Sequence, residues 1–312
     1  MTDADTDRYH RHHRGRRLAE AALSIGALAA CAAWAGHEIG VRPLRATADR
    51  RRRSELFSHI TELLTRADIR VVFQPIISTE TGRLVGAEAL SRFQAVNPAD
   101  LPDPPDVVFA QAAAVGLGVE LELLAVRIAL LAAEALPRDL YVSVNVSPAS
   151  VLSPELTDVL LASPLPLDRI VLEITEHVSV PDYNTLTTRI DELRAFGVRL
   201  AVDDAGAGFA SFRHILRLSP EYIKLDRTLI ENIADDPARR ALAAAVVLFA
   251  FEMGSSVVAE GIETIAELRM TQTLGIDAVQ GYLLGRPTDD WGTWAEWHST
   301  GPLYRLRAVA SA

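Results

Sequence analysis

Short apolar runs rich in β-branched residues alternate with longer helical segments along most of this chain. The helical segments include residues 120–136, 186–197 and 238–254. Each run between such segments has the length and composition of a buried strand. The pattern predicts eight strands, at residues 71–77, 84–93, 140–147, 169–175, 198–204, 222–226, 255–260 and 276–281.

The alternation of strands and helices predicts an α/β fold. Eight strands separated by helices over about 240 residues match the size and rhythm of a TIM-like (β/α)8 barrel. A doubly wound open sheet is the alternative, but no glycine fingerprint for a dinucleotide follows the first strand. A helix precedes the barrel, because apolar residues recur at helical spacing over residues 56–64, and Ser54 is its predicted N-cap.

Polar side chains lie at or near the end of each predicted strand. A barrel brings the carboxyl ends of its strands to one face, where barrel enzymes place their chemistry. Any one of these residues could be explained as a cap or turn residue. That explanation would have to apply separately at all eight strands, which favours a shared site. In order, the strands carry Gln74, Glu88, Asn145, Glu173, the pair Asp203 and Asp204, Lys224, Glu260 and Gln280.

Asp203 and Asp204 place two adjacent carboxylates at the end of an apolar strand, before a glycine-rich turn. Carboxylates crowded this closely require cations, and oxygen ligands without histidine or cysteine favour Mg²⁺ or Mn²⁺. Two consecutive aspartates can serve two ions, with one carboxylate shared. Two ions about 3.5–4 Å apart activate a water and stabilise the leaving oxygen in phosphodiester cleavage. The sequence therefore predicts a two-metal site.

The composition excludes several other classes of protein. Among 312 residues Cys31 is the only cysteine, which excludes an internal disulfide framework and a cysteine-based zinc cluster. The net charge of −10 argues against binding to duplex nucleic acid. Residues 1–53 hold 11 arginines and 6 acidic residues, a net charge of +5, whereas the remainder carries −15. This shift predicts a boundary near residue 54.

The basic segment before that boundary has two parts. Residues 1–17 lack apolar periodicity and are predicted to be disordered. Residues 21–36 are uncharged, and extension to Val41 reaches membrane-spanning length but includes His37 and Glu38. Three interpretations stay open: a membrane anchor over about residues 21–41, a cleaved signal peptide, or an alanine-rich helix.

Eight short motifs follow one another between about residues 56 and 290. They are "FQPI" (73–76), "EALSR" (88–92), "VNVS" (144–147), "LEITE" (172–176), "VDD" (202–204), "YIKLDR" (222–227), "AEGIE" (259–263) and "QGYLLGRP" (280–287). In this order they resemble the EAL family, the cyclic di-GMP phosphodiesterases. The resemblance implies a barrel with one antiparallel strand, usually the first. It also implies hydrolysis of cyclic di-GMP to linear pGpG by a metal-activated water.

The resemblance further implies a role for each matching position. The catalytic residues would be Glu260, Lys224 and Glu88, with Lys224 holding the attacking water and offsetting negative charge. The ligands of two Mg²⁺ or Mn²⁺ ions would be Glu88, Asn145, Glu173, Asp203, Asp204 and Glu260. The substrate would contact Gln74, Arg92, Gln280 and Glu263, and Glu176 would steady the loop after Asp204.

One stretch departs from the family pattern. The family loop Asp-Asp-Phe-Gly-Thr-Gly-Tyr-Ser reads Asp-Asp-Ala-Gly-Ala-Gly-Phe-Ala at residues 203–210. Ala205 loses an aromatic packing group, and Ala207 and Ala210 lose hydroxyls. Because this loop positions the second metal in the family, two functions stay open: an active phosphodiesterase, or a weak or inactive cyclic di-GMP receptor. An enolase-type barrel is a more distant alternative.

We therefore expect three parts: a basic tail over residues 1–53, a phosphodiesterase barrel over residues 54–298, and a tail over residues 299–312. The expected partners are cyclic di-GMP and a second copy of the barrel. Because cyclic di-GMP is an intracellular messenger, the barrel is expected in the cytoplasm. It would be anchored to the cytoplasmic membrane if residues 21–41 span it.

Overall fold

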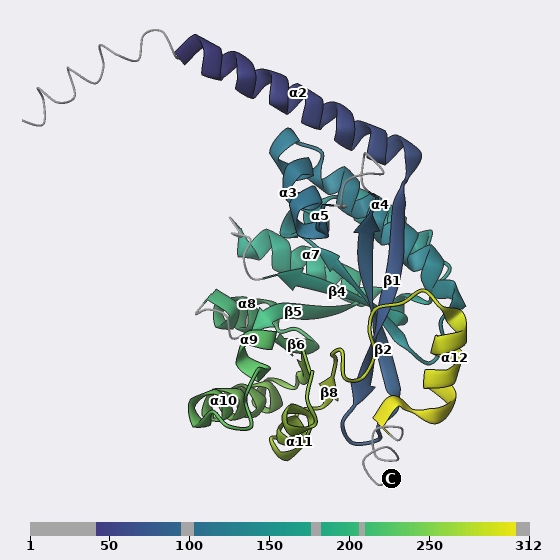
Figure 1. The fold of residues 1–312 in the computed structure, drawn as a ribbon, viewed down its shortest axis with the longest axis vertical. Coiled ribbons are helices and arrows are strands. Elements are labelled where there is room, and N and C mark those ends of the chain that lie inside the picture. Colours follow the sequence, from purple (N-terminus) through teal and green to yellow (C-terminus); the bar gives the residue numbers. More distant parts are fainter. Residues whose placement is uncertain (1–41, 95–102, 176–181, 206–209, 304–312) are drawn as a thin grey trace, which may run out of the picture. The chain divides into compact units, whose positions relative to one another are not determined.

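Eight strands close into a barrel in the computed structural model, which describes residues 42–94, 103–175, 182–205 and 210–303 (Figure 1). All eight predicted strands are present, so the predicted (β/α)8 barrel is confirmed. In chain order they are β1 Ile69–Ser78, β2 Leu84–Phe93, β3 Tyr141–Val146, β4 Ile170–Thr175, β5 Arg199–Ala205, β6 Tyr222–Leu225, β7 Ser256–Ala259 and β8 Ala278–Val279.

Strand β1 runs against its neighbours. It pairs antiparallel with β2 from Ile69 to Ile77, and antiparallel with β8 near its end. The remaining neighbours, from β2 to β8, pair in parallel. The expectation of one antiparallel strand at the start of the barrel is therefore confirmed. The carboxyl ends of β2 to β8 consequently share one face.

Helices connect the strands in the parts of the chain that the structure describes. Local sequence sets several of their starts: the Asp236 side chain accepts hydrogen bonds from the first turn of one helix, and Thr264 with Glu267 forms a capping box. The helices are α2 Arg42–Arg66, α3 Pro105–Val115, α4 Gly118–Ala132, α5 Pro148–Leu152, α6 Glu155–Leu161, α7 Tyr183–Ala195, α8 Ala210–Leu218, α9 Arg227–Ile230, α10 Pro237–Met253, α11 Ile265–Thr273 and α12 Trp291–Thr300.

Helix α2 starts earlier than the sequence predicts. It begins at Arg42, so Ser54 is inside the helix and the predicted N-cap is wrong. The Ser54 carbonyl instead accepts a hydrogen bond from the Ser58 hydroxyl, 3.0 Å away. Arginine and alanine are good helix formers, which explains why the helix extends through the arginine run. The compact unit that holds the barrel runs from His59 to Ala312.

Several predicted features lie outside the described residues. These are the candidate anchor at residues 21–41, Glu176, most of the altered loop, and residues 304–312 of the predicted C-terminal tail. Among the helices described between residues 42 and 303, none combines the length and the apolar character that a membrane span needs.

An apolar layer fills the barrel below its carboxyl rim. Tyr141 of β3 and Tyr222 of β6 stack across the interior, with ring centroids 5.1 Å apart. The Tyr141 ring needs the absence of a side chain at Gly86 of β2, because a Cβ there would lie 2.5 Å from two ring carbons. Small and branched residues complete this layer, among them Ala201 and Val258. Close packing at this level supports the polar rim.

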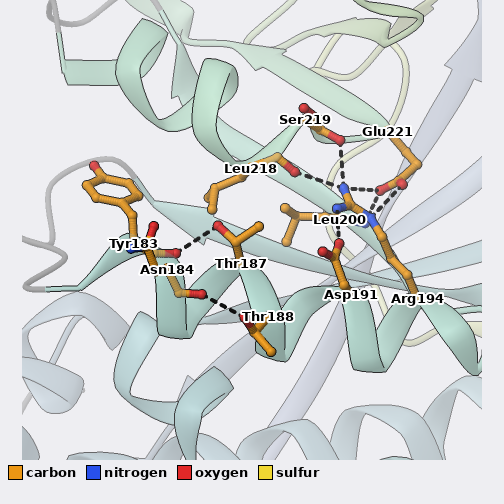
Figure 2. Close-up of polar contacts among 10 residues, drawn as sticks. All are labelled: Tyr183, Asn184, Thr187, Thr188, Asp191, Arg194, Leu200, Leu218, Ser219 and Glu221. Atoms are coloured by element: carbon orange, nitrogen blue, oxygen red, sulfur yellow. Dashed lines mark hydrogen bonds and ion pairs between the residues drawn. The ribbon is translucent and has the colours of Figure 1, made fainter.

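The connection before β6 is fastened to α7 by one arginine (Figure 2). Arg194 donates to the carbonyls of Leu218 and Ser219, at 3.0 and 2.6 Å, and to the Glu221 carboxylate at 2.9 Å. Glu221 also accepts the backbone N–H of Leu200, 2.7 Å away. These bonds join α7, β5 and the start of β6 below the rim. They therefore help to set where β5 and β6 end.

Candidate active site

The polar residues predicted for the barrel mouth lie at one level of the barrel. Asn145 pairs with Glu173 on the neighbouring parallel strand. Glu260 and Gln280 follow the last residues of β7 and β8 directly. Because side chains alternate along a strand, residues of matching register point to the same side. The strand ends thus gather these groups at the mouth.

Gln74 and Glu88 reach this level from the middle of their strands. They face each other in the β1–β2 pairing, and both strands continue past them. Strand β2 pairs with β3 only as far as Ala89, one residue after Glu88. In the part of β2 that belongs to the barrel, Glu88 therefore lies near the carboxyl end.

Lys224 lies at the centre of the cluster. It is 2 % exposed, and it is the only lysine of the chain. Four carboxylates from four strands or strand ends surround its ammonium. The Nζ atom lies 2.6 Å from Glu260 Oε1, 2.8 Å from Glu173 Oε2, 3.2 Å from Asp203 Oδ1 and 3.6 Å from Glu88 Oε1.

Amide side chains hold Glu88 on the other side of the cluster. Asn145 donates to its Oε1 atom at 3.2 Å, and Gln280 donates to its Oε2 atom at 2.5 Å. The same Gln280 amide donates to Gln74 at 3.0 Å, and Gln74 donates to the Gly285 carbonyl at 3.3 Å. One hydrogen-bonded chain therefore fixes the Glu88 carboxylate between β1, β3 and β8.

Burial makes two of the carboxylates hard to ionise. Desolvation raises the pKa of Glu173 to about 8, and the nearby Glu88 and Asp203 add to the effect against the pull of Lys224. The same balance, led by burial, raises the pKa of Glu260 well above its ordinary value. Near neutral pH the metal-free site therefore favours the protonated form of Glu173, and burial shifts Glu260 in the same direction.

Glu88 and Lys224 are instead stabilised in their charged forms. Burial opposes ionisation of Glu88, but the Lys224 ammonium and the amide hydrogen bonds outweigh it and lower the pKa of Glu88. Burial also disfavours the charged ammonium, yet the surrounding carboxylates raise the pKa of Lys224 well above its ordinary value. The Lys224 ammonium at the centre of the network therefore stays protonated.

The charge of the cluster does not balance when every group is ionised. Four carboxylates around one ammonium leave an excess of three negative charges. Asp203 Oδ1 and Gln280 Oε1 are buried without a hydrogen-bond partner in the described part of the chain. The ammonium contact of Asp203 is an ion pair that lacks hydrogen-bond alignment. Further positive charge therefore fits this site.

The donor set suits hard divalent cations, because carboxylate and amide oxygens are the ligands that Mg²⁺ and Mn²⁺ prefer. No three acidic, histidine or cysteine side chains among the described residues already surround a common metal position. Lys224 instead lies among the carboxylates. Metal entry would therefore require the ammonium to give up some of these contacts.

Four predicted site residues lie apart from this cluster or have side chains outside the description. Arg92 donates to the carbonyl of Ser91 at 2.8 Å, beyond the barrel part of β2. Glu263 forms an ion pair with Arg227 at 3.1 Å and is 40 % exposed. Asp204 belongs to β5, but its side chain is outside the description, as is all of Glu176. Their predicted roles stay predictions.

Two glutamates that the sequence analysis missed support the rim. Glu122 of α4 accepts the Ser147 N–H at 2.8 Å and the Ser150 hydroxyl at 2.6 Å, which fixes the turn after Asn145. Glu267 accepts backbone N–H groups of Glu263 and Thr264, in the loop after β7. The capping pattern at residues 264–267 was a signal for Glu267. No local pattern marks Glu122.

The fold and this cluster define a class: a (β/α)8 barrel whose mouth carries buried acids and amides around one lysine. Residues 58–287 match the EAL domain. The chain belongs to this family. In sequence it is 30 % identical over 241 residues to the bifunctional diguanylate cyclase/cyclic di-GMP phosphodiesterase MucR of Pseudomonas aeruginosa, covering 75 % of this chain and 35 % of MucR.

Solved structures give the same assignment. The MucR phosphodiesterase in complex with cyclic di-GMP superposes with a TM-score of 0.67 at 28 % identity, covering 75 % of this chain and 97 % of that one. BlrP1 of Klebsiella pneumoniae, solved with calcium and cyclic di-GMP, gives 0.63 at 31 % identity over 71 % of this chain and 56 % of its own. A manganese complex of BlrP1 matches with the same TM-score of 0.63, at 30 % identity.

The chain spans only about a third of the length of the first curated relatives that it matches, with 36 %, 36 % and 35 % of each covered. The matched segments are 266, 251 and 241 residues long.

Proposed function

We propose that this barrel is a divalent-metal-dependent phosphodiesterase that hydrolyses cyclic di-GMP to linear pGpG. The observation that carries the proposal is the buried cluster of Glu88, Glu173, Asp203 and Glu260 around Lys224 at the mouth of an EAL barrel. The name of MucR and the cyclic di-GMP complexes of MucR and BlrP1 support the substrate.

Each residue at the mouth has a role in this proposal. Glu88, Asn145, Glu173, Asp203, Asp204 and Glu260 would hold two Mg²⁺ or Mn²⁺ ions. Such ions supply the charge that activates a water and neutralises the phosphate during cleavage. The calcium and manganese complexes of BlrP1 support a divalent site.

The chain's own groups would handle the proton and the developing charge. Glu260, whose carboxylate is 20 % exposed, faces the mouth more openly than Glu173 at 2 %. It is therefore the carboxylate best placed to accept the proton of the attacking water. Lys224, in contact with Glu260, would hold that water and offset negative charge on the phosphate oxygens.

Groups at the edge of the mouth would bind the dinucleotide. Gln74 and Gln280 form part of the wall beside Glu88. Arg92 would pair with a phosphate, since a guanidinium recognises phosphate oxygens in a bidentate manner. Glu263 would complete the pocket, and Glu176 would steady the loop after Asp204.

The experiment is product analysis with the full chain. Purified protein is incubated with cyclic di-GMP and Mg²⁺ or Mn²⁺, and nucleotides are separated by chromatography. We expect pGpG, no product after chelation, and loss of turnover in Glu88→Ala and Glu260→Ala. Glu252→Gln, an exposed change on α10, is the matched control and retains activity. Absence of linear product with both metals would refute the hydrolase.

The altered loop at residues 203–210 favours a second candidate function, a cyclic di-GMP receptor with little or no turnover. Alanines stand where the family carries an aromatic residue and two hydroxyls. Calorimetric binding of cyclic di-GMP together with absence of pGpG would support the receptor. Restoration of turnover by Ala205→Phe with Ala207→Thr would assign the deficit to the loop.

Three statements about assembly and location belong to the same proposal. The barrel would form a homodimer, and light scattering of the purified chain would measure the mass. Residues 21–41 would associate with the cytoplasmic membrane, which fractionation of cells that express the full chain would test. The barrel would act in the cytoplasm, where its proposed substrate is made. Residues 1–53, 54–298 and 299–312 would be the tail, barrel and second tail.

A further inference from the structure

A cavity lies at the opposite end of the barrel from the acidic mouth. Its volume is about 720 Å³, within the range of roughly 300–1,000 Å³ that is typical of small-molecule sites. It is lined by the first residues of β3, β6, β7 and β8, by the β1–β2 turn, and by the end of α11 with the loop that follows. Nothing in the proposed hydrolysis uses it.

One wall of this basal cavity is aromatic. Tyr141 and Tyr222 line it and stack on each other inside the barrel. Tyr141 is only 8 % exposed, and its hydroxyl makes no hydrogen bond to another described residue. Burial raises its pKa far above the ordinary value, so the hydroxyl stays protonated and can donate. Val85 and Val258 add apolar surface beside the rings.

Two exposed acidic residues also line the cavity. Glu80 of the β1–β2 turn and Asp277 before β8 both line the cavity, and the Thr79 N–H donates to the Asp277 carbonyl at 3.0 Å, which holds the two segments together. Neither carboxylate is ion-paired with a described residue, although Asp277 accepts the Val257 N–H at 2.7 Å. None of the lining residues is an arginine, lysine or histidine.

A guanidinium lies beside the aromatic wall, because Arg199 donates a hydrogen bond to the Tyr222 hydroxyl. The guanidinium of Arg199 lies 5.3 and 5.4 Å from the ring centroids of Tyr141 and Tyr222. It also donates to the Asp168 carbonyl at 2.9 Å and is not among the lining residues. A cationic group in the cavity would therefore be repelled near Arg199 and attracted to Glu80 and Asp277, with an apolar body against the tyrosines.

We propose that this basal cavity is a second binding site that takes a small amphiphilic amine, a molecule with an aromatic or apolar body and one protonated amino group. The body would pack on Tyr141 and Tyr222, and the ammonium would pair with Glu80 and Asp277. The site is separate from the acidic mouth, because none of the mouth residues is among those that line the cavity.

The strands join the two ends of the barrel. Tyr222 precedes Lys224 by two residues on β6, and Val258 precedes Glu260 by two residues across the end of β7. Residues two apart on a strand point to the same face, so the cavity wall and the acidic cluster are successive levels of one interior. Binding can nevertheless be measured without any readout of activity.

The test uses the full chain and three probes of nearly equal shape: benzylamine, benzyl alcohol and benzoate. Binding is followed by NMR of protein labelled at tyrosine, with titration to millimolar concentrations. We expect benzylamine to shift the signals of Tyr141 and Tyr222 and to bind about three- to tenfold more tightly than benzyl alcohol. Two partly solvated ion pairs would give a preference of this size. Benzoate should bind most weakly.

A double variant, Glu80→Gln with Asp277→Asn, removes both charges and keeps an acceptor for the Val257 N–H. It should lower benzylamine affinity to that of benzyl alcohol, whereas the control Glu252→Gln should leave it unchanged. Circular dichroism and the tyrosine spectrum report whether the variant is folded. Equal binding of the three probes, or unchanged affinity in a folded double variant, would overturn the proposal. So would the absence of shifts at both tyrosines.

Discussion

The ammonium of Lys224 lies 2.6 Å from Oε1 of Glu260, the shortest of its four carboxylate contacts. The pair lies across neighbouring strands, and the Glu260 N–H donates to the Leu225 carbonyl at 3.0 Å. Burial disfavours the charged form of Glu260, yet its carboxylate is held beside the buried ammonium of Lys224. Proton, ammonium and metal compete for the same oxygens, and four testable expectations follow from that competition.

Replacement of Lys224 by methionine removes the central cation while keeping a side chain of similar length. Loss of one partner from a buried ionic cluster costs about 3–5 kcal/mol, so we expect a clear fall in the melting temperature of metal-free protein. Hydrolysis should fall by on the order of 100-fold or more, because one electrostatic group is typically worth this much. Thermal denaturation and product analysis measure the two effects.

The same variant separates a structural from an electrostatic effect. Mn²⁺ should stabilise folded Lys224→Met more than the wild type, because the ion no longer competes with an ammonium. The exposed change Arg217→Met on α8 is the control, with little effect on either measurement. Equal stabilisation by Mn²⁺ in the variant and the wild type would contradict competition at this site.

Metal affinity should rise with pH in the range from about 6 to 8. Since burial raises the pKa of Glu173 to about 8, and that of Glu260 well above normal, a metal must displace protons from these groups. Each displaced proton adds up to about tenfold in affinity per pH unit below the folded pKa. Calorimetry in buffers of different ionisation heat counts the released protons. A pH-independent affinity with no proton release would be inconsistent with this expectation.

The stability of the metal-free protein should change with pH in the opposite direction from the metal affinity. A carboxyl with a raised folded pKa contributes stability below its unfolded value, about 4.3, and loses that contribution as pH rises through the folded value. Stability of the chelated protein should therefore decrease between about pH 5 and 8. Because Lys224 is the only lysine, lysine labelled with ¹⁵N at Nζ gives one NMR signal that follows its ionisation directly.

Glu122 should affect metal use without contacting the metal. Glu122→Ala leaves the Ser147 N–H and the Ser150 hydroxyl without their acceptor, at a cost of about 1–3 kcal/mol. We expect a higher metal concentration for half-maximal hydrolysis, because the turn after Asn145 loosens. Glu122→Gln should restore most of the affinity, and the exposed Glu120→Ala on the same helix is the control. If folded Glu122→Ala needs the same metal concentration for half-maximal hydrolysis as the wild type, Glu122 has no role in positioning the metal site.

Gly86 should resist any side chain. Since a Cβ would lie 2.5 Å from the Tyr141 ring, Gly86→Ala should destabilise the barrel by about 1–3 kcal/mol. In the double variant with Tyr141→Leu, the smaller leucine side chain leaves room for the added Cβ. This variant should therefore recover part of the lost stability. Gly292→Ala at the start of α12 is the control, where the nearest contact is 3.3 Å. Additive losses in the double variant, measured by urea unfolding, would exclude the contact as the cause.

The sequence by itself determined the strands, their order, and most residues of the acidic mouth. Runs such as residues 71–77 and 198–204 are local patterns, and a barrel converts the end of each strand into a position on one rim. The family motifs then assigned Glu88, Asn145 and Glu260 to that rim. These patterns are periodic and local, so they can be recognised in the sequence without knowledge of the contacts between distant residues.

Only the tertiary structure decided what those residues touch. Three features join positions far apart in the chain: the central place of Lys224, the stacking of Tyr141 on Tyr222 beside Gly86, and the hydrogen bond from the Ser147 N–H to Glu122. Such contacts depend on register and barrel closure, which a one-residue shift would alter. The basal cavity likewise follows from barrel closure.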